Sequence, residues 1–271
     1  MTTIIKIGGE LLETPHDMRS VVEHVRHAAQ DGPLVVVHGG GRELSAEVAR
    51  RGGTPQLVDG IRVTDADALA AAVGVLAGTI NTRLVAALGA AGVRAVGLSG
   101  VDGALLRSRR APRARAQSGV MVDLGHVGQP VPEGDTAVLR VLCDNAFVPV
   151  VASLGVDAEG HVLNVNADVA ASHLAIALRA ARLYVLGGTD GVFDAVGATI
   201  ATLSHADAEA LVGSGAARDG MAAKLDACTR ASACGVADVR ILNGRAGRLP
   251  AGGTRVVLSV GRSSHAPGRA S

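Results

Sequence analysis

Two short apolar runs that end in glycine, TIIKIGG at residues 3–9 and LVVVHGGG at residues 34–41, decide the fold class of this chain. Each run predicts a buried strand that stops at a glycine turn. The segment from about 17 to 29 between them repeats its apolar residues at helical spacing. Because a strand, a helix and a second strand in this order form a parallel crossover unit, the two runs predict an α/β protein.

The alternation of strands and helices continues along most of the 271 residues. The pattern predicts further strands near 95–98, 148–151, 183–186, 239–242 and 254–258. It predicts further helices near 43–51, 66–88, 136–145, 168–178, 205–212 and 221–234. The helix near 66–88 has the clearest core-facing stripe, formed by Leu69, Val73, Leu76, Ile80, Leu84 and Leu88.

The segment 100–134 interrupts this alternation. It is rich in Gly, Pro and Arg, and its short β-like pieces at 104–107 and 120–124 predict hairpins that stand out from the sheet. We therefore expect a three-layer αβα sandwich with a mainly parallel central sheet and protruding β-hairpins. The sequence favours a division into lobes at 1–178 and 179–261, followed by a frayed tail at 262–271.

Composition excludes several classes of protein. Hydrophobic residues make up 48% of the chain and charged residues 19%, which excludes disorder over most of its length. The 26 Lys and Arg against 25 Asp and Glu, with one Tyr, two Phe and no Trp, predict no nucleic-acid partner and no membrane-surface partner. The start, MTTIIKIGGELL, has no secretory pattern, and no run of about 18 apolar residues follows, so we expect a cytoplasmic protein. We interpret Cys143, Cys228 and Cys234 as reduced packing residues.

Three glycine turns lie at the ends of predicted strands: Gly8-Gly9, Gly39-Gly40-Gly41 and Gly187-Gly188. In an open α/β sheet the ligand crevice lies beyond the carboxyl ends of the strands, so these turns would meet there. Glycine lets backbone N–H groups approach an anion, and the helix that follows adds its positive end. Any single turn could serve only as a tight strand-to-helix connection. Together, with Lys6 just before the first pair, the three turns favour a phosphate site.

Common nucleotide and nucleophile motifs are absent from the sequence. The chain has neither a G-x-x-x-x-G-K-[ST] loop nor a G-x-G-x-x-G turn after a strand, which excludes a Walker-type ATPase and the dinucleotide fingerprint. His38 and its three glycines are similar to the oxyanion loop of esterases. That function needs a G-x-S-x-G elbow, and the nearest segment, GLSGV at 97–101, breaks the pattern at its fifth position. The sequence therefore does not favour a hydrolase.

A set of motifs in one order carries a resemblance that covers residues 3–258. The motifs are IIKIGGELL near the start, VVVHGGG at 35–41, GIRVT at 60–64, VLAGTIN at 75–81, DLGHVG at 123–128, NVNAD at 164–168 and DGMAAK at 219–224. Through them the chain resembles the acetylglutamate kinase branch of the amino acid kinase family. HGGG alone is a weak motif, whereas NVNAD followed by DGMAAK is specific.

The resemblance implies an ATP-dependent kinase that makes an acyl phosphate. Lys6 and Lys224 would contact the phosphates from the two lobes, and Asp168 would hold both ammonium groups in place and offset their repulsion. An acyl carboxylate acceptor is already ionised at neutral pH, so the reaction needs no general base. Outside its motif, Asp168 would be interpreted as a carboxylate that stabilises a helix N-terminus.

The resemblance also implies which residues bind the ligands. Those that would donate N–H groups to the phosphoryl group are Gly8, Gly9, Gly40 and Gly41. Arg62 and Asn164 would hold the α-carboxylate and the amide of the substrate. Those on the nucleotide side would be Gly187, Gly188, Asp190, Gly191, Gly220 and Met221. The lobe 1–178 would bind the amino-acid substrate and the lobe 179–261 would bind ATP. ATP would bring Mg²⁺, held mainly by phosphates and water, and we expect no dedicated metal site in the protein.

Two segments depart from the family pattern. The turn LGGTDG at 186–191 carries its acidic residue, Asp190, two positions later than the family commonly does, which puts the nucleotide contacts of that turn in question. The other segment is a run of arginines at Arg107, Arg109, Arg110, Arg113 and Arg115. This run is either a solvated hairpin loop or a docking surface for an acidic protein, as in related kinases that phosphorylate aminoadipate on a small acidic carrier protein.

N-Acetyl-L-glutamate is the substrate that the resemblance favours, in arginine biosynthesis. The alternatives are a kinase of carrier-bound aminoadipate or glutamate in a lysine or ornithine route, and a non-catalytic amino-acid-sensing domain of the same fold. Retention of Lys6, Asp168 and Lys224 argues against the sensor. In relatives inhibited by arginine, the resemblance implies an N-terminal helix that joins dimers into a hexamer, and here only Met1 and Thr2 precede the first strand. We therefore expect a homodimer that is joined through the helix near 66–88 and is insensitive to arginine.

Overall fold

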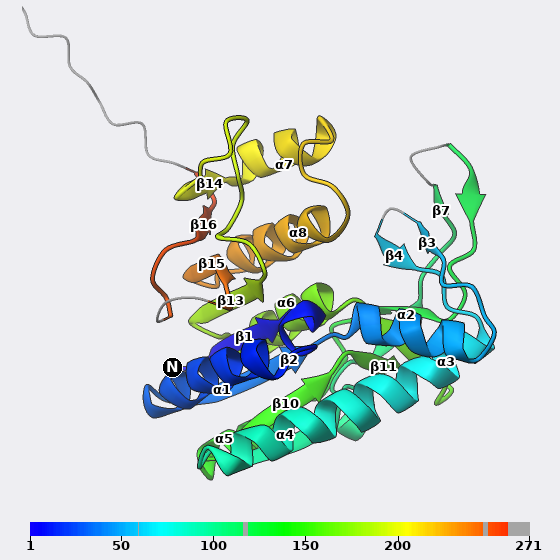
Figure 1. Ribbon diagram of the computed structural model, residues 1–271, viewed down its shortest axis with the longest axis horizontal. Coiled ribbons are helices and arrows are strands. Elements are labelled where there is room, and N and C mark those ends of the chain that lie inside the picture. The colour runs from blue at the N-terminus through cyan, green and yellow to red at the C-terminus, as the bar shows by residue number, and fades with distance from the viewer. Residues whose placement is uncertain (59, 116–118, 246–248, 260–271) are drawn as a thin grey trace, which may run out of the picture.

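A computed structural model describes residues 1–58, 60–115, 119–245 and 249–259. Its centre is an eight-stranded sheet in the order β14-β16-β15-β13-β1-β2-β10-β5, in which all neighbours are parallel except β15 and β16 (Figure 1). The strands are β1 (Thr3–Ile7), β2 (Leu34–His38), β5 (Ala95–Ser99), β10 (Val148–Ala152), β13 (Arg182–Gly187), β14 (Thr202–Ser204), β15 (Asp238–Asn243) and β16 (Thr254–Val257). This mainly parallel sheet confirms the predicted fold class.

Helices cover both faces of the sheet. One layer contains α1 (Pro15–Gln30), α2 (Gly41–Arg50), α3 (Ala66–Ala72), a π-helical segment (Val73–Ile80) and α4 (Asn81–Ala90). The opposite layer contains α5 (Ala137–Asp144), α6 (Ala167–Ala177), α7 (His205–Gly213) and α8 (Asp219–Ala233). Side chains of β1 alternate between the layers, because Ile5 and Ile7 pack in the core with α1 and α4 whereas Ile4 packs in the core with α6 and α8. Lys6 shares the face of Ile4 and therefore points toward α6 and α8.

The segment 100–134 forms hairpins, as its composition predicted. β6 (Ser108–Arg110) pairs antiparallel with β9 (Val127–Pro130), and β7 (Ala114–Arg115) pairs antiparallel with β8 (Met121–Val122). β6 and β9 join β11 (Leu154–Val156) and β12 (Val162–Val165) in a second sheet of order β11-β12-β9-β6. Figure 1 shows β7 standing out from the body at the same end as a small hairpin of β3 (Leu57–Val58) and β4 (Ile61–Arg62).

One predicted β-like piece in this segment, 104–107, is wrong in large part. Residues Asp102–Ala104 form a 3-10 turn, and Arg107 makes only an isolated bridge to Val156. The reason is local, because the Asp102 carboxylate accepts hydrogen bonds from the backbone N–H and the hydroxyl of Ser99. These bonds close a turn directly after β5. The apolar residues at 104–106 alone would suggest a strand there.

The apolar stripe of the long helix is displaced near its N-terminal end. Leu76, Ile80, Leu84 and Leu88 are buried as predicted, but Val73 is 40% exposed and Leu69 is only half-buried. Leu76 and Ile80 lie four positions apart within the π-helical segment, a spacing that its wider turn accommodates, and Leu84 and Leu88 continue the stripe in α4. In the regular turn before the π-helical segment, the buried positions are instead Ala68, Ala71 and Ala72, together with Val75 at the start of the π-helix.

The helical stretch Ala66–Ala90 is long and apolar enough to cross a membrane by length and composition alone. In this fold it is one layer of the sandwich, and its buried leucines belong to the core shared with α1 and β2. Packing in the core of the sandwich therefore explains the apolar composition of this stretch.

The boundary proposed near residue 178 falls between α6 and β13. β13 pairs with β1 in register from Thr3 with Arg182 to Ile7 with Leu186, so the central sheet continues across this boundary. The division into lobes stays a prediction, and the tail at 262–271 lies outside the described residues. Of the three cysteines, Cys228 is buried as expected, whereas Cys234 is exposed because it follows the last turn of α8.

Candidate active site

Three charged side chains from three elements meet at the carboxyl end of β1. Lys6 comes from β1, Asp168 from the first turn of α6 and Lys224 from α8. The Nζ atom of Lys6 lies 2.9 Å from Oδ1 of Asp168, and Nζ of Lys224 lies 3.6 Å from Oδ2. Only 5% of the Lys6 side chain and 7% of the Asp168 side chain are exposed, against 14% for Lys224. The structure thus brings together the three residues that were predicted to be catalytic.

The two lysines respond differently to this arrangement. Burial disfavours the charged form of Lys6, but the charge and hydrogen bond of Asp168 outweigh it and raise the pKa of Lys6 above its usual value. Repulsion by Lys6, together with burial, lowers the pKa of Lys224. Burial also opposes ionisation of Asp168, yet the two lysines lower the pKa of its carboxyl. At neutral pH the cluster therefore holds two ammonium groups around one carboxylate.

The N-cap of α6 leaves Asp168 free for the lysines. Asn166 is the capping residue, and its Oδ1 accepts hydrogen bonds from the backbone N–H groups of Asp168 at 2.8 Å and Val169 at 3.2 Å. Because Asn166 satisfies the helix end, the Asp168 carboxylate is not needed as a cap and binds both ammonium groups. This observation favours the catalytic interpretation of Asp168 over the helix-terminus one.

Two glycine turns form the floor of a cavity of about 230 Å³ beside this cluster. A Cβ atom on Gly9 would lie 2.8 Å from the Cα atom of Gly40, so the turns after β1 and β2 are in contact. Gly9, Gly40 and Gly41 line the cavity together with Lys6 and Asp168. The N-terminus of α2 begins at Gly41 and points its first N–H groups to this end.

Gly8 differs from the other glycines of this group. Its backbone N–H donates to the carbonyl oxygen of Leu186 at 3.0 Å, and Gly8 is not among the residues that line the cavity. The expectation that Gly8 offers an N–H group to a phosphate is therefore wrong for this structure. The parallel pairing of β1 with β13 takes that donor, a consequence of sheet order that the local sequence does not reveal.

Arg62 and Asn164 line the same cavity. Arg62, in β4, donates from Nη2 to the carbonyl of Gly41 at 2.9 Å and to the hydroxyl of Ser45 at 2.6 Å. Its Nη1 atom is buried and has no hydrogen-bond partner within the described part of the chain. Asn164, in β12, donates from Nδ2 to Thr64 Oγ1 at 3.1 Å, which leaves its carbonyl oxygen to accept a bond. The two residues are thus oriented by neighbours and keep free groups for a ligand.

Only some of the residues predicted to bind the nucleotide lie together beside Lys224. Gly187 lies beside the cluster, since a Cβ atom there would be 3.6 Å from Cε of Lys224. The carbonyl of Gly220 accepts a bond from Nζ of Lys224 at 3.4 Å. Asp190 is exposed and accepts a bond from Asn243 at 2.7 Å. Gly191 is buried against Thr254 with a φ of 121°, a conformation that favours glycine, so its role in this structure is to shape the turn.

The two remaining residues of that set lie at the edges of this region. A Cβ atom on Gly188 would contact the guanidinium of Arg245, and Met221 packs against the core on the α6 and α8 side. No interaction of either residue identifies a nucleotide contact within the described residues.

A buried contact between Asn81 and His38, which the sequence did not predict, supports the turn after β2. Asn81 donates from Nδ2 toward His38 Nε2 at 3.1 Å and to the carbonyl of Val150 at 2.9 Å. The Nδ1 atom of His38 lies 3.1 Å from the carbonyl oxygen of Gly39. Burial lowers the pKa of His38 to about 4, so the ring is neutral at pH 7. The only sequence signal was a polar residue at the end of the apolar motif VLAGTIN.

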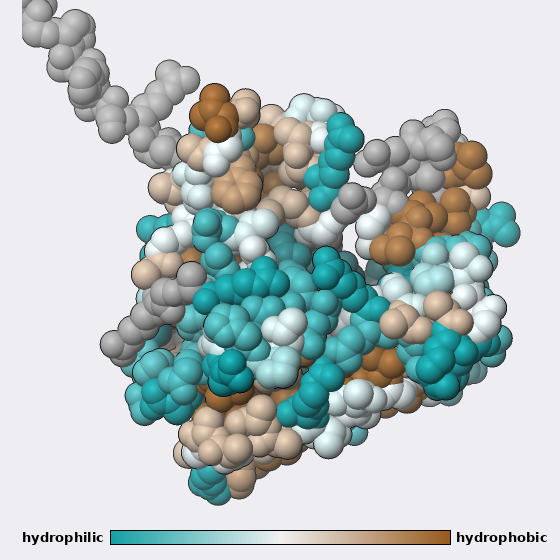
Figure 2. All heavy atoms as spheres, viewed as in Figure 1, coloured by the Kyte–Doolittle hydropathy of each residue, from teal (hydrophilic) through white to brown (hydrophobic). Residues whose placement is uncertain are grey.

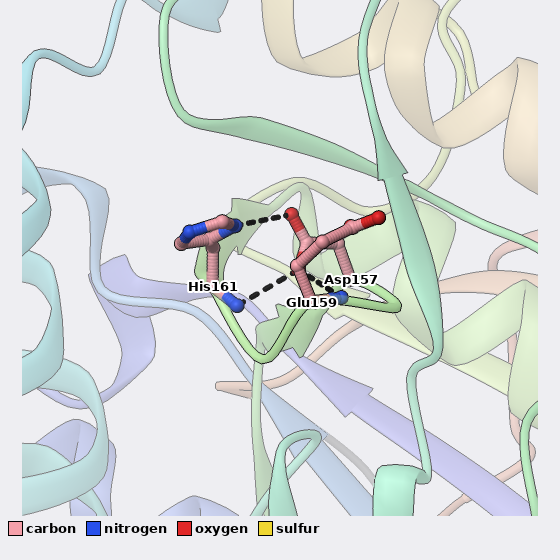
Figure 3. A group of neighbouring side chains, drawn as sticks. All are labelled: Asp157, Glu159 and His161. Carbon is pink, nitrogen blue, oxygen red and sulfur yellow. Dashed lines mark hydrogen bonds and ion pairs between the residues drawn. The ribbon is translucent and has the colours of Figure 1, made fainter.

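A group of possible metal ligands, drawn in Figure 3, is not part of the lining of the cavity. It consists of Asp157, Glu159 and His161 in the turn between β11 and β12. Oδ1 of Asp157 accepts bonds from the backbone N–H groups of Glu159 at 3.0 Å and His161 at 2.8 Å, and Oδ2 lies 3.0 Å from His161 Nδ1. These bonds explain the group as the closure of an exposed turn.

Comparison of the chain with known proteins points to one family. Residues 1–243 match the amino acid kinase family. The chain belongs to this family. An acetylglutamate kinase of Methanoculleus marisnigri is 40% identical over 248 residues, covering 90% of this chain and 86% of the relative. An acetylglutamate kinase of Methanopyrus kandleri is 40% identical over 243 residues, covering 89% and 94%.

Solved structures of other proteins share the fold. An N-acetylglutamate synthase from Neisseria gonorrhoeae, in complex with coenzyme A and N-acetyl-glutamate, is 28% identical with a TM-score of 0.80, covering 96% of this chain and 60% of that chain. A carbamate kinase from Giardia lamblia bound to AMP-PNP is 15% identical with a TM-score of 0.66, covering 94% and 98%, which supports the fold alone. The resemblance inferred from the motifs is confirmed.

Proposed function

We propose that this amino acid kinase transfers the terminal phosphoryl group of ATP to the side-chain carboxylate of N-acetyl-L-glutamate, a step of arginine biosynthesis. The observation that carries the proposal is the buried Lys6–Asp168–Lys224 cluster beside a cavity that Lys6, Asp168 and Arg62 line together. The identity of about 40% to acetylglutamate kinases over about nine-tenths of the chain supports the same activity.

The residues of the cluster suit phosphoryl transfer. Negative charge spreads over the transferring group and the leaving oxygen in the transition state, so fixed positive charges accelerate the reaction. Lys6 and Lys224 would supply those charges, and Asp168 would position them without touching the substrate. The N–H groups of Gly9, Gly40 and Gly41 would add further donors. The accepting carboxylate is ionised at neutral pH, so no side chain has to remove a proton.

Arg62 and Asn164, which line the same cavity, suit an N-acylated amino acid. The unpartnered Nη1 of Arg62 would bind the α-carboxylate, and the free carbonyl oxygen of Asn164 would accept the amide N–H. A free α-amino group would place a positive charge beside Arg62, whereas an acylated nitrogen is neutral. The β3–β4 and β7–β8 hairpins expose apolar side chains, seen as brown atoms in Figure 2. These side chains come from Leu57, Ile61, Val120 and Met121.

ATP would occupy the side of Lys224 and Gly187, and Mg²⁺ would enter with it. The only carboxylates among the described residues that line the cavity are Glu10 and Asp168, and both oxygens of Asp168 face lysines. This donor set fits a metal that is held mainly by phosphates and water, with charge neutralisation as its chemical contribution. We place the reaction in the cytoplasm, and the protein acts as a homodimer through the exposed face of the helix Ala66–Ala90.

Trapping of the acyl phosphate tests the proposed activity. Hydroxylamine converts an acyl phosphate to a hydroxamate, so hydroxamate formation with MgATP is compared for N-acetyl-L-glutamate, N-succinyl-L-glutamate and glutamate or aminoadipate on an acidic carrier protein. We expect the highest kcat/KM for N-acetyl-L-glutamate. No ATP-dependent hydroxamate with any acceptor would favour the sensing domain.

The carrier arm of this assay also tests the arginine run, in which Arg109, Arg110 and Arg113 are exposed. The variant with Gln at Arg109, Arg110, Arg113 and Arg115 is expected to phosphorylate N-acetyl-L-glutamate at the wild-type rate. Faster turnover of a carrier-linked acceptor, lost in this variant and at high salt, would replace the proposal with the carrier-dependent kinase.

A further inference from the structure

The carboxylate of Glu10 lies within the phosphate end of the site. Glu10 follows the Gly8-Gly9 turn in a 3-10 turn (Gly9–Leu11) and lines the same cavity as Lys6 and Asp168. A Cβ atom on Gly8 would come within 2.5 Å of both carboxylate oxygens of Glu10, and one on Gly187 would lie 3.5 Å from Oε1. The carboxylate is thus folded back over Gly8 and beside Gly187. It fills space that two side-chain-free glycines leave open.

Glu10 acts on the lysines through its charge. Within the described residues its carboxylate forms no hydrogen bond and no ion pair shorter than 4.0 Å. Its negative charge nevertheless favours the protonated forms of both lysines. It adds to the rise in the pKa of Lys6 and opposes the fall in the pKa of Lys224. With Glu10 and Asp168 ionised, the formal charges of the two lysines are fully balanced. The ligand-free site therefore carries its own anion next to the lysines.

We propose that Glu10 makes the site select the metal complex of ATP over metal-free ATP. The proposal rests on the proposed function, because it assumes that the triphosphate binds beside Lys224 and Gly187. A triphosphate without a metal would approach a neutral group of side chains and would meet the Glu10 carboxylate at close range, where like charges repel. A triphosphate that carries Mg²⁺ presents a cation to the same carboxylate. Glu10 thereby penalises the first ligand and tolerates the second.

The neighbouring carboxylate cannot perform this role. Asp168 has one oxygen on each lysine, so its charge is used within the cluster. Glu10 is half-buried at the cavity wall and keeps both oxygens free of direct partners in the described chain. A glutamine at position 10 keeps the size and shape of the side chain, removes its charge and replaces one acceptor oxygen with a donor NH2 group. Glu13, in the same loop, provides a matched control, because its carboxylate pairs with Arg42 at 3.3 Å instead of facing the lysines.

Calorimetric titration with AMP-PNP tests the proposal in a readout that does not depend on turnover. Wild type, Glu10→Gln and Glu13→Gln are each titrated with AMP-PNP in excess Mg²⁺ and with AMP-PNP in EDTA. We expect Glu10→Gln to bind the metal-free nucleotide about tenfold more tightly than wild type and to change the Kd of the magnesium complex much less. Glu13→Gln is expected to match wild type with both ligands.

Two results would overturn the inference about Glu10. One is an unchanged ratio of the two Kd values in Glu10→Gln. The other is a ratio that falls only because the magnesium complex binds more weakly, which would make Glu10 a metal ligand. If wild type binds AMP-PNP in neither form, the proposed function itself is contradicted, so the two failures are distinguishable.

Discussion

Lys6 and Asp168 form a buried ion pair in which Nζ lies 2.9 Å from Oδ1 and at most 7% of either side chain is exposed. Charges are buried in proteins only when they are paired or ligated. Here one carboxylate serves two cations, since Lys224 approaches its other oxygen at 3.6 Å. Two ammonium groups are therefore fixed close to the reacting groups before a nucleotide arrives. Such preorganised charge is the main requirement of phosphoryl transfer.

Asp168→Asn is expected to lower both stability and activity. The substitution leaves Lys6 buried without its counter-ion, so the free energy of unfolding in urea should fall by about 3 kcal/mol, and kcat should fall on the order of 10²-fold. Asp226→Asn is the control, because Asp226 is 70% exposed and 3.9 Å from Arg230, and it should change stability by less than about 0.5 kcal/mol. A loss below about 1 kcal/mol in Asp168→Asn would contradict the buried-pair interpretation.

Acid should destabilise the wild type through His38. Its pKa is about 4 in the folded protein and about 6.5 when unfolded, so the folded state binds a proton more weakly. The associated stability is fully present above the unfolded pKa, declines as the pH falls below it, and is lost once the pH has passed the folded pKa. The full effect is about 3 kcal/mol. Urea unfolding between pH 7 and pH 4 should show a shallower loss in His38→Gln than in wild type; parallel pH profiles would argue against this role.

Arg62→Ala should weaken binding of the acceptor and leave nucleotide binding nearly unchanged. Loss of a charge-assisted bond to the α-carboxylate costs roughly 1.5–3 kcal/mol, which corresponds to a rise of about 10- to 100-fold in the KM for N-acetyl-L-glutamate. Arg62→Lys keeps the charge and loses the planar fork, so it should give an intermediate value. A rise confined to the KM for ATP would assign Arg62 to the nucleotide side.

Wild type should have the mass of a dimer in light scattering. Val73 lies on the exposed face of the helix Ala66–Ala90 with 40% of its surface accessible. Val73→Asp would place an unpaired carboxylate in the proposed interface and should shift the mass toward the monomer at micromolar concentration. Val196→Asp, a change of the same kind at a turn residue that is 89% exposed, should leave the mass unchanged. A wild-type hexamer or monomer would contradict the prediction.

The sheet was predictable from the sequence because its signals are local, and the Lys6–Asp168–Lys224 cluster was predictable through the motifs that carry the family resemblance. β1 and β2 each combine a short apolar run with a glycine turn, and NVNAD and DGMAAK mark Asp168 and Lys224. The strand order of an α/β sheet then brings their ends together. The boundary near residue 178 was predicted from the order of elements along the chain. In the structure β13 pairs with β1, so the central sheet continues across that boundary.

The parts that the sequence did not predict depend on distant partners. The backbone N–H of Gly8 donates to the carbonyl of Leu186 because β1 pairs with β13. Asn81, at the start of α4, donates to His38 at the end of β2 and to a carbonyl of β10. The displaced stripe at Val73 comes from a π-helical segment, and helical spacing assumed throughout does not reveal it. Glu10 lies within the motif IIKIGGELL, whose sequence indicates no role for it, because only the folded turn places its carboxylate over Gly8.

The most direct test of the central claim is kcat for ATP-dependent acyl phosphate formation from N-acetyl-L-glutamate, measured by hydroxamate trapping in wild type, Lys6→Ala and Lys224→Ala. Circular dichroism confirms that each variant is folded. The Lys6–Asp168–Lys224 cluster predicts turnover by wild type and a loss on the order of 10²-fold or more in each variant, because each removes charge stabilisation made mainly in the transition state. A folded variant with near-normal kcat, or a wild type that forms no hydroxamate, would contradict it.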